Sequence, residues 1–116
     1  MAFSTAKLDQ LLEERSRRDE AERQALVDKV LRWLDVHGKQ CGIRKAYLFG
    51  SLAQPYRFHQ QSDIDIAIQP DRPIDLFALI GTISALMGRD VDLIELEKSH
   101  FAHRIRQTGI EWIATD

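Results

Sequence analysis

The sequence contains few of the residues that mark disulfide scaffolds, membrane spans or polycationic surfaces. Its single cysteine, Cys41, cannot form an internal disulfide and favours a reducing compartment, with the cytoplasm as the default. No apolar run approaches the roughly 20 residues of a transmembrane helix, and the N-terminal residues lack the apolar core of a secretory signal. Lysine and arginine total 16 against 18 acidic residues, so the net charge of −2 offers no bulk positive surface for nucleic acid.

Hydrophobic residues make up 44% of the chain and charged residues 29%, which is the composition of an ordinary soluble globular protein. At 116 residues the chain is long enough for one domain with a real core and too short for two. Within that domain we expect a helical extension at residues 1–40 followed by a core at residues 41–116.

The N-terminal third of the sequence predicts a long helical region over residues 5–37. Ser4 or Thr5 is suited to cap its start, and Gly38 is suited to end it. The second half is amphipathic, with an apolar stripe formed by Leu26, Val27, Val30, Leu31, Trp33 and Leu34. Residues 13–24 carry almost nothing to bury, so they form either a solvated helix held by ion pairs or a break between two helices.

The beginning of this helix carries three leucines, Leu8, Leu11 and Leu12. The simple interpretation is that they belong to a solvated helix, like the polar segment behind them. The alternative is an arm that uses the leucines as a contact face, toward a partner protein or toward a second copy of the chain.

Turn residues divide the rest of the sequence into short strands and helices. The expected strands cover about residues 46–49, 63–69, 91–96 and 110–114, and the expected helices cover residues 52–54, residues 74–87 and about eight residues capped by Ser99. The helix at residues 74–87 is apolar on most sides and should be well covered. The predicted fold class is α/β (α+β), a small mixed sheet flanked by helices.

Acidic residues on strands are the most informative feature of the sequence. Asp63 and Asp65 are two apart in the alternating strand D-I-D-I-A-I, so they stand side by side on one face. Asp92 lies in the next strand, where a lone aspartate would be explained by a strand end that faces water. Close carboxylates repel one another unless a cation sits between them. Three together form the oxygen ligand set that Mg²⁺ prefers, usually with substrate phosphates.

The Gly50-Ser51 turn, which ends the first strand, supplies a site for those phosphates. Glycine lets the backbone approach an anion closely, and the N–H groups of the following short helix can donate hydrogen bonds to it. The Ser51 hydroxyl can donate another. A Gly-Ser pair alone is usually a plain turn, so the interpretation depends on its place just before the strand that carries Asp63 and Asp65.

Taken together, these elements resemble the nucleotidyltransferase superfamily with the polymerase-β-like fold. The matching features are Gly50-Ser51 after a strand, the Asp63-x-Asp65 strand, and a later strand with Asp92. The arrangement is most similar to the minimal nucleotidyltransferases, many of which are antitoxins paired with HEPN-domain toxins. The resemblance covers about residues 43–114 and implies a polymerase-β-like core with an added N-terminal helix.

The resemblance also implies an activity, a Mg²⁺-dependent transfer of a nucleoside monophosphate, most simply AMP from ATP. In that family Gly50 and Ser51 would bind the triphosphate, and Asp63 and Asp65 would ligate a pair of Mg²⁺ ions. Asp92 would complete the metal site and serve as base or orienter for the attacking hydroxyl. The implied acceptor is a tyrosine hydroxyl on a HEPN-type RNase toxin, which the modification silences.

Two features depart from the family pattern. The loop between Ser51 and Asp63 is one residue longer than is usual in small members, a change that costs little. Many relatives carry Arg-Gly after the serine, whereas this chain has Gln54-Pro55. Arg57 lies nearby and is therefore a candidate phosphate ligand.

Other functions stay open on the sequence alone. The chain could be a non-catalytic antitoxin that sequesters its partner, or a small-molecule nucleotidyltransferase, although the latter generally carry an extra domain for the acceptor. Nucleic-acid polymerisation fits the charge and size least well. The histidines His59, His100 and His103 show no metal-ligand spacing with the aspartates, and we interpret them as surface residues.

Overall fold

The computed structural model describes residues 5–115 and is built on a four-stranded mixed sheet. The strands are β1 (Ile43–Phe49), β2 (Ile64–Pro70), β3 (Val91–Glu95) and β4 (Ile110–Ile113), in the order β3-β2-β1-β4. β1 is antiparallel to β2 and to β4, while β2 is parallel to β3. The predicted small mixed sheet flanked by helices is confirmed.

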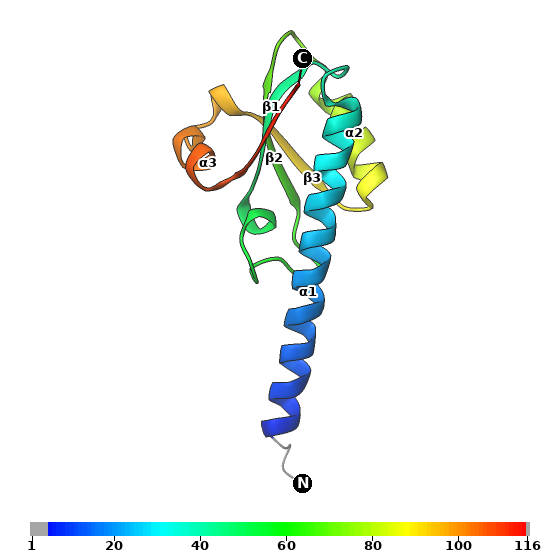
Figure 1. Ribbon diagram of the computed structural model, residues 1–116, viewed down its shortest axis with the longest axis vertical. Coiled ribbons are helices and arrows are strands. Elements are labelled where there is room, and N and C mark those ends of the chain that lie inside the picture. Colours follow the sequence, from blue (N-terminus) through cyan, green and yellow to red (C-terminus); the bar gives the residue numbers. More distant parts are fainter. Residues whose placement is uncertain (1–4, 116) are drawn as a thin grey trace.

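Helices lie on both sides of this sheet (Figure 1). They are α1 (Thr5–Trp33), α2 (Leu76–Met87) and α3 (Ala102–Thr108). α1 continues into a π-helical turn, η1 (Leu34–Gly38), and two short 3-10 turns, η2 (Gly50–Ala53) and η3 (Leu96–Lys98), follow β1 and β3. None of the helices in residues 5–115 combines the length and apolarity that crossing a membrane requires.

One face of the sheet, here called the closed face, carries the main core. Alternation along β2 directs Ile64, Ile66 and Ile68 to this face, where each is at most 1% exposed. α1 and α2 cover it with apolar side chains, chiefly Leu26, Val30, Leu34, Leu79, Ile83 and Met87. Full burial of each large aliphatic side chain is worth about 1.5–3 kcal/mol, so this face supplies most of the stabilisation.

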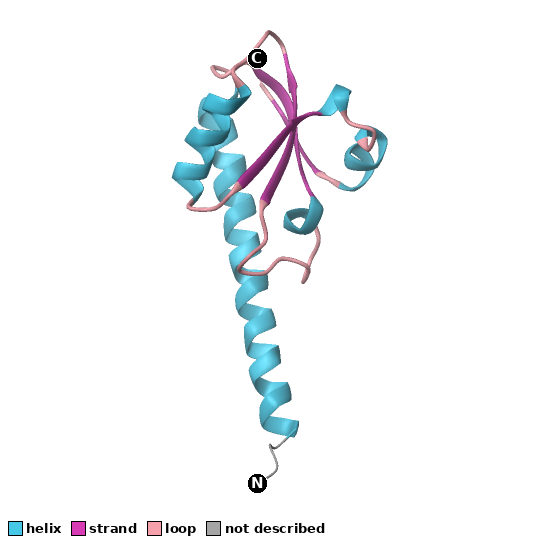
Figure 2. Ribbon diagram, turned by 180° about the vertical axis from the view of Figure 1, so that it is seen from behind, coloured by secondary structure: helices cyan, strands magenta, loops and turns pink. Residues whose placement is uncertain are grey.

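The opposite face, here called the open face, has a smaller apolar cluster of Tyr47, Ala67, Leu96 and Ile105. In the view from behind, α3 lies across the sheet from α1 and α2 (Figure 2). Because α3 has only seven residues, it covers part of this face and leaves the rest available to a ligand.

α1 is a single continuous helix, so the break considered for residues 13–24 does not occur. Its N-terminal half extends away from the sheet and accounts for the 63 Å length of the molecule (Figure 1). Ser4, one of the two expected caps, lies outside the described residues. The expectation that residues 13–24 bury almost nothing is wrong at two positions, because Glu20 and Arg23 are 6% and 8% exposed.

α2 and α3 differ from their expected forms. Asp75 caps α2 by accepting a hydrogen bond from the Ala78 N–H, so the helix begins at Leu76 rather than at residue 74. α2 is also less covered than expected, since Phe77 on this helix is 88% exposed. Ser99 does not cap α3; its hydroxyl accepts from the Phe101 N–H in the turn before the helix.

Candidate functional site

The three aspartates gather at one end of the open face. Asp63 directly precedes β2, Asp65 lies in β2, and Asp92 lies in β3. In the parallel ladder Asp65 is the register partner of Asp92, one inter-strand spacing away. β1 runs antiparallel to β2, and its last residue, Phe49, is the register partner of Asp65. The Gly50 turn that follows therefore lies at the same end of the sheet as the aspartates.

Asp65 is the most perturbed of these carboxylates. Partial burial, which is the largest cause, and the nearby charges of Asp92 and then Asp63 together raise its pKa to about 6. Asp63 and Asp92 are themselves exposed. The strand geometry therefore concentrates negative charge at a point where ionising Asp65 is unfavourable, and a bound cation would relieve that cost.

The aspartates fit Mg²⁺ by the chemistry of their donors. Hard carboxylate oxygens suit this ion, and its usual sites in proteins use only one or two carboxylates with waters and substrate phosphates. Within residues 5–115, no three histidine, cysteine, aspartate or glutamate side chains are gathered tightly enough to form a ready-made metal cage. The ligands are thus of the right type and on one face, without being preassembled.

Gly50 cannot be replaced by a residue with a side chain without disturbing this site. Its φ of 67° lies in the left-handed region, where residues with a Cβ are strained. A Cβ at this position would also collide with the Asp65 carboxylate. The turn after β1 therefore brings a bare backbone against the most perturbed acid of the site.

The other predicted phosphate ligands flank this turn. Ser51 lies within η2 and is partly exposed, and its hydroxyl has no hydrogen-bond partner among residues 5–115. Arg57 lies in the exposed turn that follows, where its N–H donates to the Gln54 carbonyl at 3.2 Å. Its guanidinium has no hydrogen bond or ion pair in the described part of the chain. A phosphate role for Arg57 stays a prediction.

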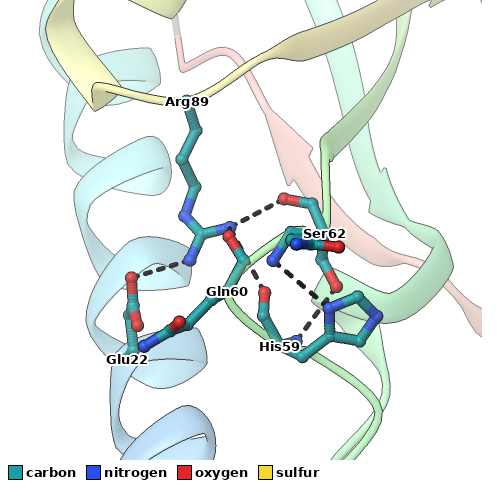
Figure 3. A network of polar contacts seen from close by, with 6 residues as sticks. Glu22, His59, Gln60, Ser62 and Arg89 are labelled. Atoms are coloured by element: carbon teal, nitrogen blue, oxygen red, sulfur yellow. Dashed lines mark hydrogen bonds and ion pairs between the residues drawn. The ribbon is translucent and has the colours of Figure 1, made fainter.

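Arg89 holds the loop that joins η2 to β2 (Figure 3). One guanidinium nitrogen donates to the carbonyls of Ser62, Gln60 and His59, at 2.7, 3.0 and 3.3 Å. The other donates to Glu22 of α1 at 2.8 Å. The guanidinium carbon also lies 4.5 Å from the centre of a buried ring, that of Phe58. These contacts fix the residues immediately before Asp63.

A buried ion pair on α1 holds the other end of the same loop. Arg23 makes a two-pronged contact with Glu20, at 2.7 and 2.8 Å, and donates a further hydrogen bond to the Leu52 carbonyl in η2. The Glu20 carboxylate also accepts from the N–H of Tyr56, whose φ of 62° is unusual for a residue with a side chain. The Arg23 contact is the main reason that the Glu20 pKa falls to about 2.

Local sequence patterns alone do not assign roles to these supporting residues. Glu20, Glu22 and Arg23 were part of a polar stretch, and Arg89 stood in a turn after Gly88. The i,i+3 spacing of Glu20 and Arg23 indicated a helical ion pair, but nothing in the chain order indicated that it would be buried against Leu52. Only the packing of α1 against the loop distinguishes these residues from the solvated charges around them.

Comparison with known proteins identifies the family. A family model described as polymerase beta, nucleotidyltransferase, matches residues 35–116, well over half of the chain. The chain belongs to this nucleotidyltransferase family. The family match begins in η1, so all of α1 precedes the matched region. None of the curated proteins compared with the chain matches it.

Solved structures share the nucleotidyltransferase fold seen here. A toxin–antitoxin crystal structure with AMP-PNP is 25% identical, with a TM-score of 0.59 over 77% of this chain and 73% of that chain. A mutant of the MntA-HpeT toxin–antitoxin is 26% identical, with a TM-score of 0.56 over 77% of this chain and 72% of that chain. The predicted likeness to minimal nucleotidyltransferases of toxin–antitoxin pairs is confirmed.

Proposed function

We propose that this protein is a Mg²⁺-dependent nucleotidyltransferase that transfers AMP from ATP to a hydroxyl on a HEPN-type toxin, and so acts as its antitoxin. The observation that carries the proposal is the placement of Asp63, Asp65 and Asp92 beside the Gly50 turn, within a nucleotidyltransferase fold. The AMP-PNP of one similar toxin–antitoxin structure supports an adenine nucleotide as substrate.

In this proposal the bare backbone of Gly50 and the Ser51 hydroxyl bind the triphosphate. Asp63 and Asp65 would hold the Mg²⁺, which would neutralise phosphate charge and polarise the reacting oxygens. Asp92 orients the acceptor hydroxyl and takes its proton. The acceptor oxygen forms a bond to the α-phosphorus, the bond between that phosphorus and the bridging oxygen breaks, and pyrophosphate leaves.

The supporting contacts explain how the loop keeps its shape without a metal. Arg89 fixes the backbone before Asp63, and Arg23 fixes the backbone of η2 after Ser51. Arginine side chains therefore hold both ends of the loop, one from α1 itself and one from Arg89, which is paired with Glu22 of α1. This arrangement limits the reorganisation that nucleotide binding requires.

The test incubates the protein with Mg²⁺, α-phosphate-labelled ATP and a HEPN-type toxin, then measures covalent label on the toxin. We expect label with the wild type and none with Asp65→Asn. The variant replaces a metal-binding carboxylate with a neutral amide of the same shape. Label on the toxin that persists with Asp65→Asn would refute the assigned site.

A second function is favoured by one observation, the altered segment after Ser51, where this chain has Gln54-Pro55 in place of the Arg-Gly of many relatives. In that case the chain is a non-catalytic antitoxin that silences its partner by binding. The double variant Asp63→Asn/Asp65→Asn separates the two. A binder still neutralises the toxin after this change, whereas an enzyme does not.

A further inference from the structure

A small cavity of about 250 Å³ adjoins the Gly50 turn on the open face. Phe49, Gly50 and Gln54 line one side, and Phe101, Arg104 and Thr108, from the α3 region, line the other. Drug-sized ligands occupy pockets of roughly 300–1,000 Å³, so this cavity matches one part of a nucleotide rather than the whole molecule. It lies beside the backbone that is proposed to bind phosphate, where a nucleobase could reach it.

Phe101 is exposed in this cavity wall although its backbone is well held. Its side chain is 68% exposed and belongs to neither core cluster of the described residues. Its carbonyl accepts from the Ile105 N–H at 2.9 Å, and Ile105 is buried against the sheet. An exposed aromatic ring on a fixed backbone is suited to stacking on a flat ligand, because little freedom is lost when it binds.

Arg104 adds a positive charge to the same wall. It is exposed, and its guanidinium has no hydrogen bond or ion pair among residues 5–115. Its backbone carbonyl accepts a hydrogen bond from the Thr108 hydroxyl at 2.8 Å. The cavity wall opposite Gly50 thus includes an arginine without a side-chain partner among the described residues, while Gln54 and Pro55 follow Ser51 at the positions where many relatives carry Arg-Gly.

We propose that the cavity is the nucleobase subsite, with Phe101 as the stacking surface for the base and Arg104 as a ligand to a phosphate held at the Gly50 turn. The proposal rests on the proposed nucleotidyltransferase function and names the residues that recognise the nucleotide. α3 therefore serves two purposes, since Ile105 anchors it to the sheet and its other side chains complete the site.

The test separates the base from the phosphates with two probes. The full chain is titrated by calorimetry with ATP and with inorganic triphosphate, both in the presence of Mg²⁺. Phe101→Ala should weaken ATP binding about tenfold or more and leave triphosphate binding within about twofold, because stacking acts only on the base. Phe101→Trp should restore ATP binding. Arg104→Gln should weaken both probes by a similar factor, because the charge acts on the phosphates.

Matched controls exist elsewhere on the surface. Phe77→Ala removes an exposed ring from α2, and Arg32→Gln removes an exposed guanidinium from α1. Both residues lie on the helices that cover the closed face, so both variants should bind the two probes as the wild type does. A thermal melt of each variant shows whether a loss of binding reflects unfolding, which is not expected because the substituted side chains are exposed.

Two results would overturn the subsite, and they differ from failure of the proposed function. If wild-type protein binds triphosphate as tightly as ATP, or if Phe101→Ala binds ATP unchanged, the base is not held in this cavity, and the phosphate site and the proposed activity still stand. If the wild type binds neither probe, the nucleotidyltransferase function fails, and the subsite fails with it.

Discussion

The two faces of the sheet are built from the same strands but are covered to very different extents. On the closed face, α1 and α2 bury isoleucines to 1% exposure or less, and Ile66 belongs to the larger apolar cluster. On the open face, the seven residues of α3 cover a small cluster, and the strand ends carry three aspartates instead of apolar residues. The contrast teaches that stability is concentrated on one face, which frees the other to hold charges that oppose folding.

The largest effect should come from removing volume on the closed face. Ile66→Ala leaves a cavity in the main core and should lower the free energy of unfolding by about 2–5 kcal/mol. Ile94→Ala makes the same change on the open face, where the side chain is only partly buried, and should cost clearly less. Urea denaturation measures both. Equal losses would show that the two faces contribute alike and would remove the contrast.

The next effect should come from the loop that leads to the open face. Arg89→Lys keeps the charge but loses the forked donors that reach three backbone carbonyls and Glu22, and should cost about 1–3 kcal/mol. Hydrogen exchange should accelerate for amides in residues 59–62. Arg106→Lys, at an exposed ion pair with Glu97, is the control and should change stability by less than about 1 kcal/mol. Unchanged exchange in the loop would contradict this role for Arg89.

A smaller loss of stability, with a large loss of nucleotide binding, is expected at the turn. Gly50→Ala forces a Cβ into the left-handed region, at about 1–2 kcal/mol, and pushes against the Asp65 carboxylate. Gly88→Ala has a similar φ of 66° but meets no atom within 4 Å, so it shares the strain without the collision. Calorimetry with ATP and Mg²⁺ should show lost binding only for Gly50→Ala. Normal binding by that variant would show that the close approach is not needed.

Removing one charge from α1 should have a modest, pH-dependent effect. Because the folded pKa of Glu20 is about 2 and lies below its ordinary value near 4.5, the carboxylate stabilises the protein above pH 4.5. That contribution is lost as the pH falls from 4.5 to 2. Glu20→Gln should therefore be less stable than the wild type at pH 7, by about 1 kcal/mol, with the difference shrinking in acid. A difference that stays constant between pH 7 and pH 3 would argue against the ion pair as its cause.

The smallest effect should be a gain in stability, whereas the preceding substitutions cause losses. The folded pKa of Asp65 is about 6, above its ordinary value of 3.8, so the wild type loses stability as the pH rises through this window. Without metal, Asp65→Asn should melt at a slightly higher temperature than the wild type above pH 6, and at the same temperature below pH 3.8. Asp9→Asn, on the exposed part of α1, is the control for the loss of a surface carboxylate. A lower melting temperature for Asp65→Asn at pH 8 would show that its carboxylate stabilises the fold.

Local patterns were sufficient to predict most of the elements and the acidic pair. The alternation around Asp63 and Asp65 and the turn at Gly50 depend on residues close together in the chain, and they appear where they were expected. Chain order could not show that Asp65 and Asp92 are register partners, because the length of the crossover between β2 and β3 does not specify a register. Nor could it show which polar residues of α1 would be buried.

The amino-acid sequence by itself determined the type of each element, the residues of the main core and the kinds of ligand available at the site. These follow from periodicity, turn residues and donor chemistry, all of which act over a few residues. Only the tertiary structure decided that Glu20 and Arg23 brace η2, that Arg89 holds the loop before Asp63, and that Phe101 and Arg104 line a cavity beside Gly50. These contacts join residues far apart in the chain, and long-range packing alone decides which charges are buried and which face solvent.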